Sequence, residues 1–170
     1  MPAKAPRVLD HERISARRDA SVLAEVVRPT GPAAAEAIPT LVNALNDDWL
    51  AASAAEALGR MGPFASAAVP GLLQALQGSD EDIRYAAAAA LAAIGPASAT
   101  AAVNILLDRL REPGEYNRCS AADCLGTIGL PAANVAVPTL LELMSDESEC
   151  TRYHVAQALN DLGCRPPDQD

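Results

Sequence analysis

A motif that recurs four times along the chain is the feature that most limits what the chain can fold into. Each copy opens on a short apolar segment and closes on a leucine that is followed four residues later by glycine. Successive closing leucines lie 33, 34 and 34 residues apart. A fixed period of this length is typical of stacked-repeat proteins, because a single unit cannot bury its own apolar face. The opening segments are Ala37–Leu41, Ala68–Leu72, Ala102–Leu106 and Ala136–Leu140, and the closing leucines are Leu58, Leu91, Leu125 and Leu159.

The composition predicts that every unit is helical. Half of the residues are apolar, only 3% are aromatic, and about a fifth are alanine, which is the best helix former. Each unit is expected to contain a first helix, such as Val69–Leu76 or Val137–Met144, then an acidic turn, then a second helix that ends near the repeated glycine. Ser79 and Asp82 have the spacing of a capping box at the start of one second helix. We therefore predict an all-α solenoid of about four helical hairpins.

The repeat spacing divides the chain into three parts. Residues 31–164 are expected to form the solenoid, and residues 165–170 a C-terminal tail. Residues 1–30 form an N-terminal extension. Residues 12–28 are expected to be a lone capping helix, because Gly31-Pro32 stands eight residues before Pro39 just as Gly62-Pro63 stands before Pro70. The expected repeat units are 33–62, 63–95, 96–129 and 130–163.

The charge distribution argues against a nucleic-acid partner. The formal net charge is −9, and residues 31–170 alone hold seven basic and eighteen acidic residues, or about −11. A body this acidic repels a phosphate backbone.

Residues 85–107 lack charges, but they are rich in alanine, contain Gly95-Pro96 and keep the repeat register, so we do not expect a membrane span. No signal-peptide pattern opens the sequence, and we expect a cytoplasmic protein.

The residues that usually carry chemistry are sparse. The four cysteines form no C-x-x-C pair, so we expect reduced, apolar side chains and neither a disulfide nor a metal site. The two histidines, His11 and His154, lie far apart in the sequence, and no nucleophile, phosphate-binding or zinc-protease motif occurs. We therefore expect no cofactor and no enzymatic activity. The cysteines are Cys119, Cys124, Cys150 and Cys164.

Three motifs together resemble HEAT repeats. They are the opening Ala-Val-Pro-x-Leu-Leu, the mid-unit Asp-x-Asp-Ile-Arg at 80–84 and the closing Ala-x-Ala-Leu-x-x-Ile-Gly. More specifically, they resemble the short bacterial type called phycobilisome-lyase HEAT-like repeats, over residues 33–163. The resemblance implies a right-handed superhelix whose second helices line a concave surface and bind a protein or peptide. It also suggests an alternative, an accessory subunit of a bilin lyase or a similar chromophore-handling complex, in which Cys119 could take part.

Five residues are the candidates for a partner-binding surface. They occupy columns of the repeat alignment that need not be buried, and tyrosine is enriched at protein interfaces. The alternative, which the sequence leaves open, is that the tyrosine rings pack against a neighbouring second helix. We expect a monomer, with end-to-end stacking between molecules as the alternative. The candidates are Tyr85, Asp123, Tyr153, His154 and Gln157.

An arginine recurs every 34 residues, early in three successive second helices. The guanidinium group matches a carboxylate with two parallel hydrogen bonds, and acidic residues lie close by in the turns. We therefore predict structural ion pairs. An arginine ladder that binds an acidic peptide is the alternative, and the net charge of the body disfavours it. The residues concerned are Arg84, Arg118 and Arg152, with Asp80, Asp82 and Asp146 as acids.

Overall fold

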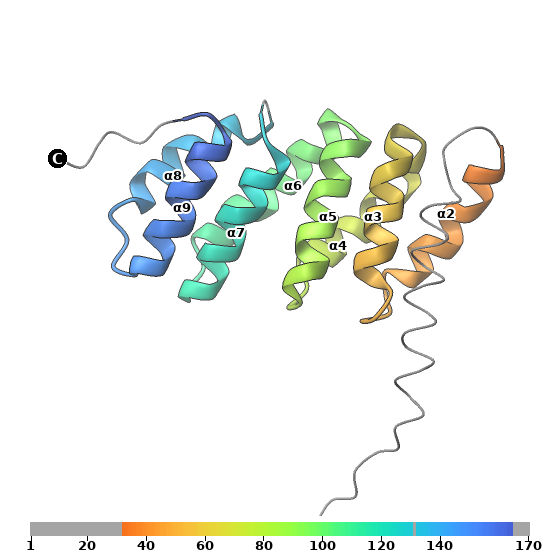
Figure 1. Ribbon diagram of the computed structural model, residues 1–170, viewed down its shortest axis with the longest axis horizontal. Coiled ribbons are helices and arrows are strands. Elements are labelled where there is room, and N and C mark those ends of the chain that lie inside the picture. Colours follow the sequence, from red (N-terminus) through yellow and green to blue (C-terminus); the bar gives the residue numbers. More distant parts are fainter. Residues whose placement is uncertain (1–31, 131, 165–170) are drawn as a thin grey trace, which may run out of the picture.

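The structure is a computed structural model that describes residues 32–130 and 132–164, and it consists of helices stacked in pairs (Figure 1). No strand occurs in these residues, so the prediction of an all-α solenoid is confirmed. The expected capping helix at 12–28, the rest of the extension 1–30 and the tail 165–170 lie outside the described residues. The pairs are α2 (Pro32–Ala44) with α3 (Ala51–Met61), α4 (Val69–Leu76) with α5 (Glu81–Ile94), α6 (Pro96–Leu110) with α7 (Glu115–Ile128), and α8 (Val137–Leu143) with α9 (Glu149–Asp161).

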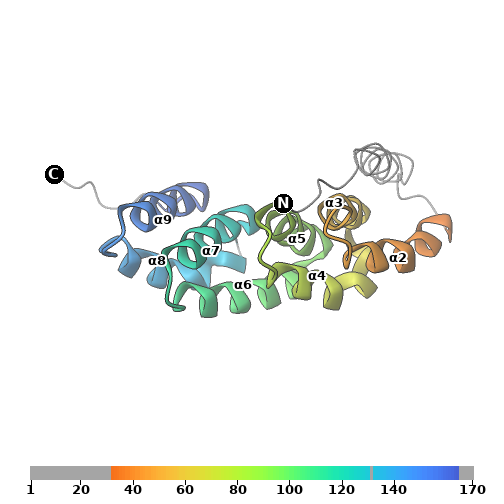
Figure 2. The same ribbon diagram turned by 90° about the horizontal axis from the view of Figure 1, so that it is seen from below.

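The helices form two layers. Figure 2 shows α2, α4, α6 and α8 side by side in one layer and α3, α5, α7 and α9 in the other. The stack is bowed, and the second set lies on the inner side of the bend (Figure 2). We call α3, α5, α7 and α9 the inner layer and the other four helices the outer layer. The inner layer faces the viewer in Figure 1.

The core is continuous along the stack. All four closing leucines are 0% exposed, and the buried side chains from Ile38 to Leu162 form a single cluster. The residues three positions after these leucines, Met61, Ile94, Ile128 and Leu162, are also buried. Each unit thus buries its apolar face against its neighbours, as the period predicts.

Small residues let the inner-layer helices approach one another closely. A Cβ atom added at Gly59 of α3 would lie 3.0 Å from the Cα atom of Ala90 on α5. One added at Gly126 of α7 would lie 3.4 Å from the Cα atom of Ala158 on α9. Both distances are at or below ordinary van der Waals contact, so a larger side chain would push the helices apart.

Proline determines where two outer-layer helices begin. Pro70 and Pro138 are the second residues of α4 and α8, and each helix follows a short 3₁₀ segment, η1 (Gly62–Ala68) or η2 (Ala132–Ala136). Asn104 stands at the same place in the third unit, and α6 runs through it without a break for 15 residues. Proline has no N–H to donate within a helix, so it favours a helix start at this point. Pro39 departs from this rule, because α2 continues through it.

Two of the inner-layer helices, α5 and α9, begin at side-chain caps. Asp80 caps α5, where its Oδ1 accepts a hydrogen bond from the Ile83 backbone N–H at 3.1 Å. Ser148 caps α9 in the same way, accepting from the Thr151 N–H at 3.2 Å. The predicted capping box at Ser79 and Asp82 is therefore wrong by one residue, because Asp80 provides the side chain that caps the helix.

The long uncharged stretch of the sequence is divided between two helices. α5 ends at Ile94, the capping residue Gly95 turns the chain with a φ of 156° and a ψ of 174°, and α6 begins at Pro96. None of the helices within the described ranges combines the length and apolar character needed to cross a bilayer.

Candidate functional site on the inner helix layer

The structure brings the five candidate surface residues together on α5, α7 and α9. His154 Nδ1 lies 2.6 Å from Asp123 Oδ2, and the Tyr85 hydroxyl is close to the same carboxylate. Gln157 Nε2 donates to the Tyr153 hydroxyl at 3.2 Å. The rings of Tyr153 and His154 meet edge to face with their centroids 5.4 Å apart. Asp123 is thus the link between α5 and α9 across α7.

The two tyrosines have different surroundings. Tyr85 is half-buried and packs against the core, and burial together with the nearby Asp123 carboxylate raises the pKa of its hydroxyl well above the usual range. Tyr153 is 61% exposed. The alternative in which the ring packs within the stack therefore applies to Tyr85, whereas Tyr153 presents its ring to solvent.

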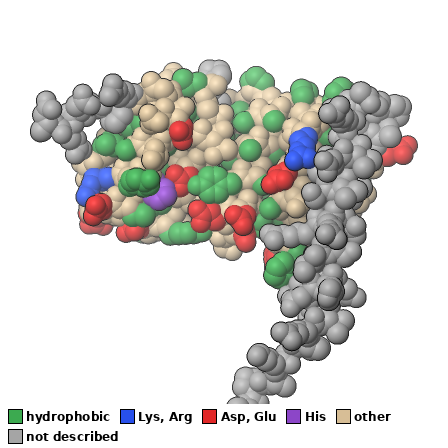
Figure 3. Space-filling model, in the orientation of Figure 1, with side chains coloured by type: hydrophobic (Ala, Val, Ile, Leu, Met, Phe, Trp, Pro, Cys, Tyr) green, Lys and Arg blue, Asp and Glu red, His purple; other side chains and the backbone are tan. Residues whose placement is uncertain are grey.

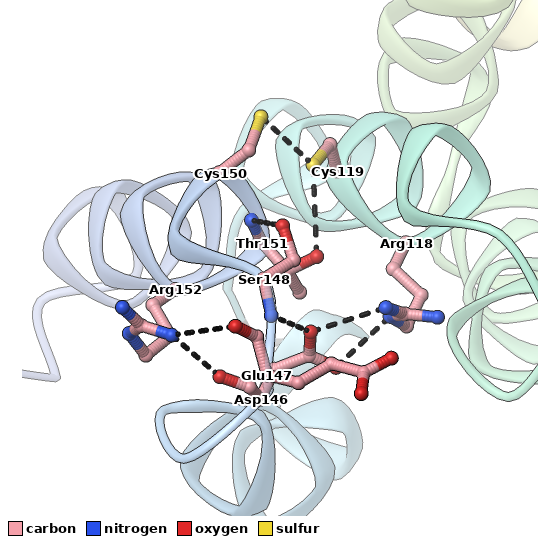
Figure 4. A network of polar contacts seen from close by, with 8 residues as sticks. All are labelled: Arg118, Cys119, Asp146, Glu147, Ser148, Cys150, Thr151 and Arg152. Carbon is pink, nitrogen blue, oxygen red and sulfur yellow. Dashed lines mark hydrogen bonds and ion pairs between the residues drawn. The ribbon is translucent and has the colours of Figure 1, made fainter.

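A cluster of thiols and imidazole lies beside these residues, between α7 and α9. Cys119 Sγ is 3.4 Å from Cys150 Sγ and 3.8 Å from Thr151 Oγ1 (Figure 4). A ring nitrogen of His154 and the two sulfurs all lie within 4.8 Å of one another. Cys119 is 6% exposed, and burial raises the pKa of its thiol, with a contribution from the neighbouring Cys150. We call Cys119, Cys150 and His154 the thiol–imidazole cluster.

The cluster opens into a pocket with acidic walls. The pocket has a volume of about 220 Å³ and lies over α5, α7 and α9. Figure 3 shows acidic side chains beside the histidine on this face. The pocket combines carboxylates with the two sulfur atoms and the imidazole nitrogen, which can each offer a lone pair. It therefore favours a cation or a basic group over an anion. The pocket is lined by Glu81, Glu115, Tyr116, Cys119, Ser120, Asp123, Cys150 and His154.

The contact between Cys119 and Cys150 is not among the predictions from the sequence, although a signal for it is present there. Cys150 and His154 are four residues apart, as are Cys119 and Asp123, so each pair occupies one face of its helix. In the repeat alignment Cys119 and Tyr153 share one column, and Cys150 lies one helical turn before Tyr153. Comparing columns at the repeat period alone therefore overlooks the contact.

A HEAT-repeat family model matches residues 38–115 and 103–169, which together span most of the chain. The chain belongs to the HEAT-repeat family. HEAT repeats generally mediate protein–protein interaction. The general repeat model does not distinguish the phycobilisome-lyase type that the motifs resemble.

Solved structures share the fold of this HEAT-repeat chain. One engineered protein, a target of the Northeast Structural Genomics Consortium, is 23% identical with a TM-score of 0.51, over 90% of this chain and 73% of that one. A second engineered protein from the same consortium is 22% identical with a TM-score of 0.50, over 92% of this chain and 76% of that one. No curated protein matches the chain. Identities this low support the fold alone.

One member of the arginine column forms an ion pair in the HEAT solenoid. Arg118 Nη2 donates to Asp146 Oδ1 at 3.1 Å, and its Nε lies 3.0 Å from Oδ2 without the alignment of a hydrogen bond. Both side chains are largely buried, and the pair joins α7 to the turn before α9 (Figure 4).

The other two arginines contact neutral oxygens. Arg84 is 1% exposed and donates to Ser120 Oγ, the Gly78 carbonyl and the Tyr116 hydroxyl. Arg152 donates to the carbonyls of Asp146 and Glu147 (Figure 4). In both cases the guanidinium bonds the carbonyl six residues earlier. Within the described part of the chain, Arg84 and Arg152 therefore donate hydrogen bonds to backbone carbonyls of the turns. The predicted ion pairs with Asp80 and Asp82 are wrong, because the guanidinium groups bond these carbonyls and not the carboxylates.

The Asp146 ion pair predicts an acid-sensitive contribution to stability. Burial alone would raise the pKa of Asp146, but the hydrogen bond from the Ser148 N–H and the Arg118 guanidinium together lower it below its usual value. A carboxylate whose folded pKa is depressed stabilises the fold fully above its unfolded pKa of about 4, and this contribution is lost as the pH falls through the lower folded value. Asp146→Asn should therefore flatten the acid limb of the unfolding free energy below about pH 4.

Urea denaturation at a series of pH values measures this effect. Asp108 provides the matched control, because its side chain is 83% exposed in a pair with Arg111. Asp108→Asn should follow the wild-type curve. An Asp146→Asn curve parallel to wild type would show that the ion pair does not contribute.

Proposed function

We propose that this HEAT-repeat chain is a non-enzymatic binding module whose inner layer holds a protein or peptide. The observation that supports this most directly is the aromatic ring of Tyr153, which is 61% exposed and contacts His154, a residue that lines the acidic pocket over the inner layer. Stacked repeats form extended concave surfaces of this kind, and binding along them is their usual mode. The proposed contacts are Asp123, Tyr153, His154 and Gln157, while Tyr85 packs against the core beside Asp123.

The chemistry of this face favours a basic, extended partner segment. Glu81, Glu115 and Asp123 line the pocket, and the body carries an excess of acidic residues. Lysine or arginine side chains of a partner would find complementary charge there, while the Tyr153 ring supplies apolar and cation–π contact. An association of this kind weakens as salt rises, because the exposed charges are screened.

Selection from a displayed library of random peptides tests this proposal without a known partner. Peptides enriched on the wild-type chain would be synthesised and titrated against wild type and Tyr153→Ala by fluorescence anisotropy. Truncating a central interface tyrosine typically costs about 2 kcal/mol, so we expect Kd to rise about 30-fold. The enriched peptides should be rich in lysine and arginine.

Leu141 offers a matched control on the outer layer. It lies on α8 and is 42% exposed, so its truncation removes an exposed apolar group from the opposite layer. Leu141→Ala should leave Kd unchanged. Loss of binding by Leu141→Ala with retention by Tyr153→Ala would place the interface on the outer layer and refute the proposal.

A further inference from the structure

Three metal-ligating side chains from two neighbouring repeats meet at the thiol–imidazole cluster. Cys119 comes from α7, and Cys150 and His154 come from successive turns of α9. We propose that Cys119, Cys150 and His154 bind a single Zn²⁺ ion, which links the last two units of the solenoid. Two thiolates and one imidazole are a ligand set that zinc prefers.

The separation of the two sulfurs fits a tetrahedral ion with little movement. Two thiolates on one zinc at Zn–S distances of about 2.3 Å are separated by about 3.8 Å. The sulfurs of Cys119 and Cys150 are 3.4 Å apart, and the imidazole nitrogen lies within 4.8 Å of both. Figure 4 shows the two sulfurs pointing toward one another across the space between α7 and α9.

Asp123 prepares His154 to act as a ligand. The contact between His154 Nδ1 and Asp123 Oδ2 at 2.6 Å holds the ring proton on Nδ1 and leaves the lone pair on Nε2. A carboxylate in this position is the usual outer partner of a zinc-bound histidine, where it orients the ring and increases its basicity. Asp123 is therefore a positioning residue for the proposed site.

The pocket provides room for a fourth ligand. Three protein ligands leave one tetrahedral position open, and the cluster faces a cavity of about 220 Å³ that Glu81 and Glu115 also line. A water molecule or one of these carboxylates would complete the coordination. Binding would transfer two thiol protons to the solvent, because zinc binds the thiolate form of cysteine.

A disulfide between Cys119 and Cys150 is the competing use of the same sulfurs. It requires the sulfurs to approach from 3.4 Å to about 2.05 Å. This reaction would leave His154 and Asp123 without a role, whereas metal binding uses all four side chains. The geometry therefore favours the metal, and the disulfide is an outcome that the experiment identifies.

Metal titration of the full, untagged chain tests the site. The protein would be stripped with a chelator, kept reduced with a phosphine, and titrated with Co²⁺ and then Zn²⁺. We expect one Co²⁺ per chain, with thiolate-to-cobalt charge-transfer absorption and the visible bands of a tetrahedral ion, displaced by Zn²⁺. Zinc should also raise the thermal unfolding temperature, because the three ligands are held together only in the folded chain.

Single substitutions distinguish the proposed zinc ligands from residues that do not bind the metal. Cys150 is exposed, so Cys150→Ser leaves the core intact and should weaken Zn²⁺ binding at least about 100-fold. Asp123→Asn should weaken it about 10- to 100-fold and retain the charge-transfer band. Cys164 lies outside the cluster, and Cys164→Ser should bind as wild type does.

Three outcomes would overturn the proposal. They are the absence of Co²⁺–thiolate absorption in the reduced chain, an affinity that Cys150→Ser does not change, and an air-formed Cys119–Cys150 disulfide in a chain that binds no metal when reduced. Cys150 is not among the proposed partner contacts, so this test can fail while peptide binding at Tyr153 succeeds, and the reverse also holds.

Discussion

Replacing Arg84 with alanine is expected to destabilise the solenoid by about 3 kcal/mol. The guanidinium is buried, and its three hydrogen bonds run from Nε to Ser120 Oγ at 2.9 Å, from Nη1 to the Gly78 carbonyl at 3.0 Å and from Nη2 to the Tyr116 hydroxyl at 2.8 Å. Hydrogen bonds from charged donors contribute about 1.5–3 kcal/mol each, and the buried Ser120 hydroxyl would lose this partner. The cost of burying the guanidinium offsets part of this loss.

Urea denaturation followed by circular dichroism measures the change. Arg84→Lys should recover only part of it, because a single ammonium cannot reach three acceptors on the turn and on α7. Arg111 is the control, because its side chain is 62% exposed in a pair with Asp108, and Arg111→Ala should change the free energy of unfolding by less than about 0.5 kcal/mol. Equal effects of Arg84→Ala and Arg111→Ala would show that the buried network contributes nothing.

The fold could be predicted from the repeat period, because burial of an apolar face depends on the overall pattern of apolar residues in a unit and not on any single side-chain contact. Leu58, Leu91, Leu125 and Leu159 recur at that period, and all four are fully buried in one core. The close approach of α3 to α5 and of α7 to α9 also follows from the sequence, since only small residues can occupy the contact at Gly59 and Gly126.

The side-chain contacts were harder to predict, because neighbouring inner-layer helices do not meet at the repeat period. Arg84 reaches Tyr116 and Ser120 at separations of 32 and 36 residues, and Cys119 meets Cys150 at 31. These separations scatter around 34 by up to one helical turn, because side chains on packed helices interdigitate. An alignment by columns therefore identifies which helices touch but not which side chains.

Charge alone was also an incomplete guide to the arginines. All three have acidic residues nearby in sequence, yet only Arg118 reaches a carboxylate among the described ion pairs. Arg84 and Arg152 instead bond the carbonyl six residues earlier. Backbone carbonyls that follow a helix end have no helical partner, so a guanidinium within reach satisfies them. Sequence spacing does not show which of these two acceptors is better placed.

Replacing Leu125 with alanine is expected to cost about 3–4 kcal/mol, because the side chain is 0% exposed in the central part of the shared core. The loss combines the transfer energy of the removed groups with the cavity that the neighbouring helices cannot fill. In a stacked-repeat protein each interface couples adjacent units, so this variant should also broaden the urea transition as the two ends of the stack unfold separately. Leu141→Ala removes the same atoms from an exposed position and should cost less than about 0.5 kcal/mol. A sharp transition with a loss below about 1 kcal/mol in Leu125→Ala would contradict a core that is continuous from unit to unit.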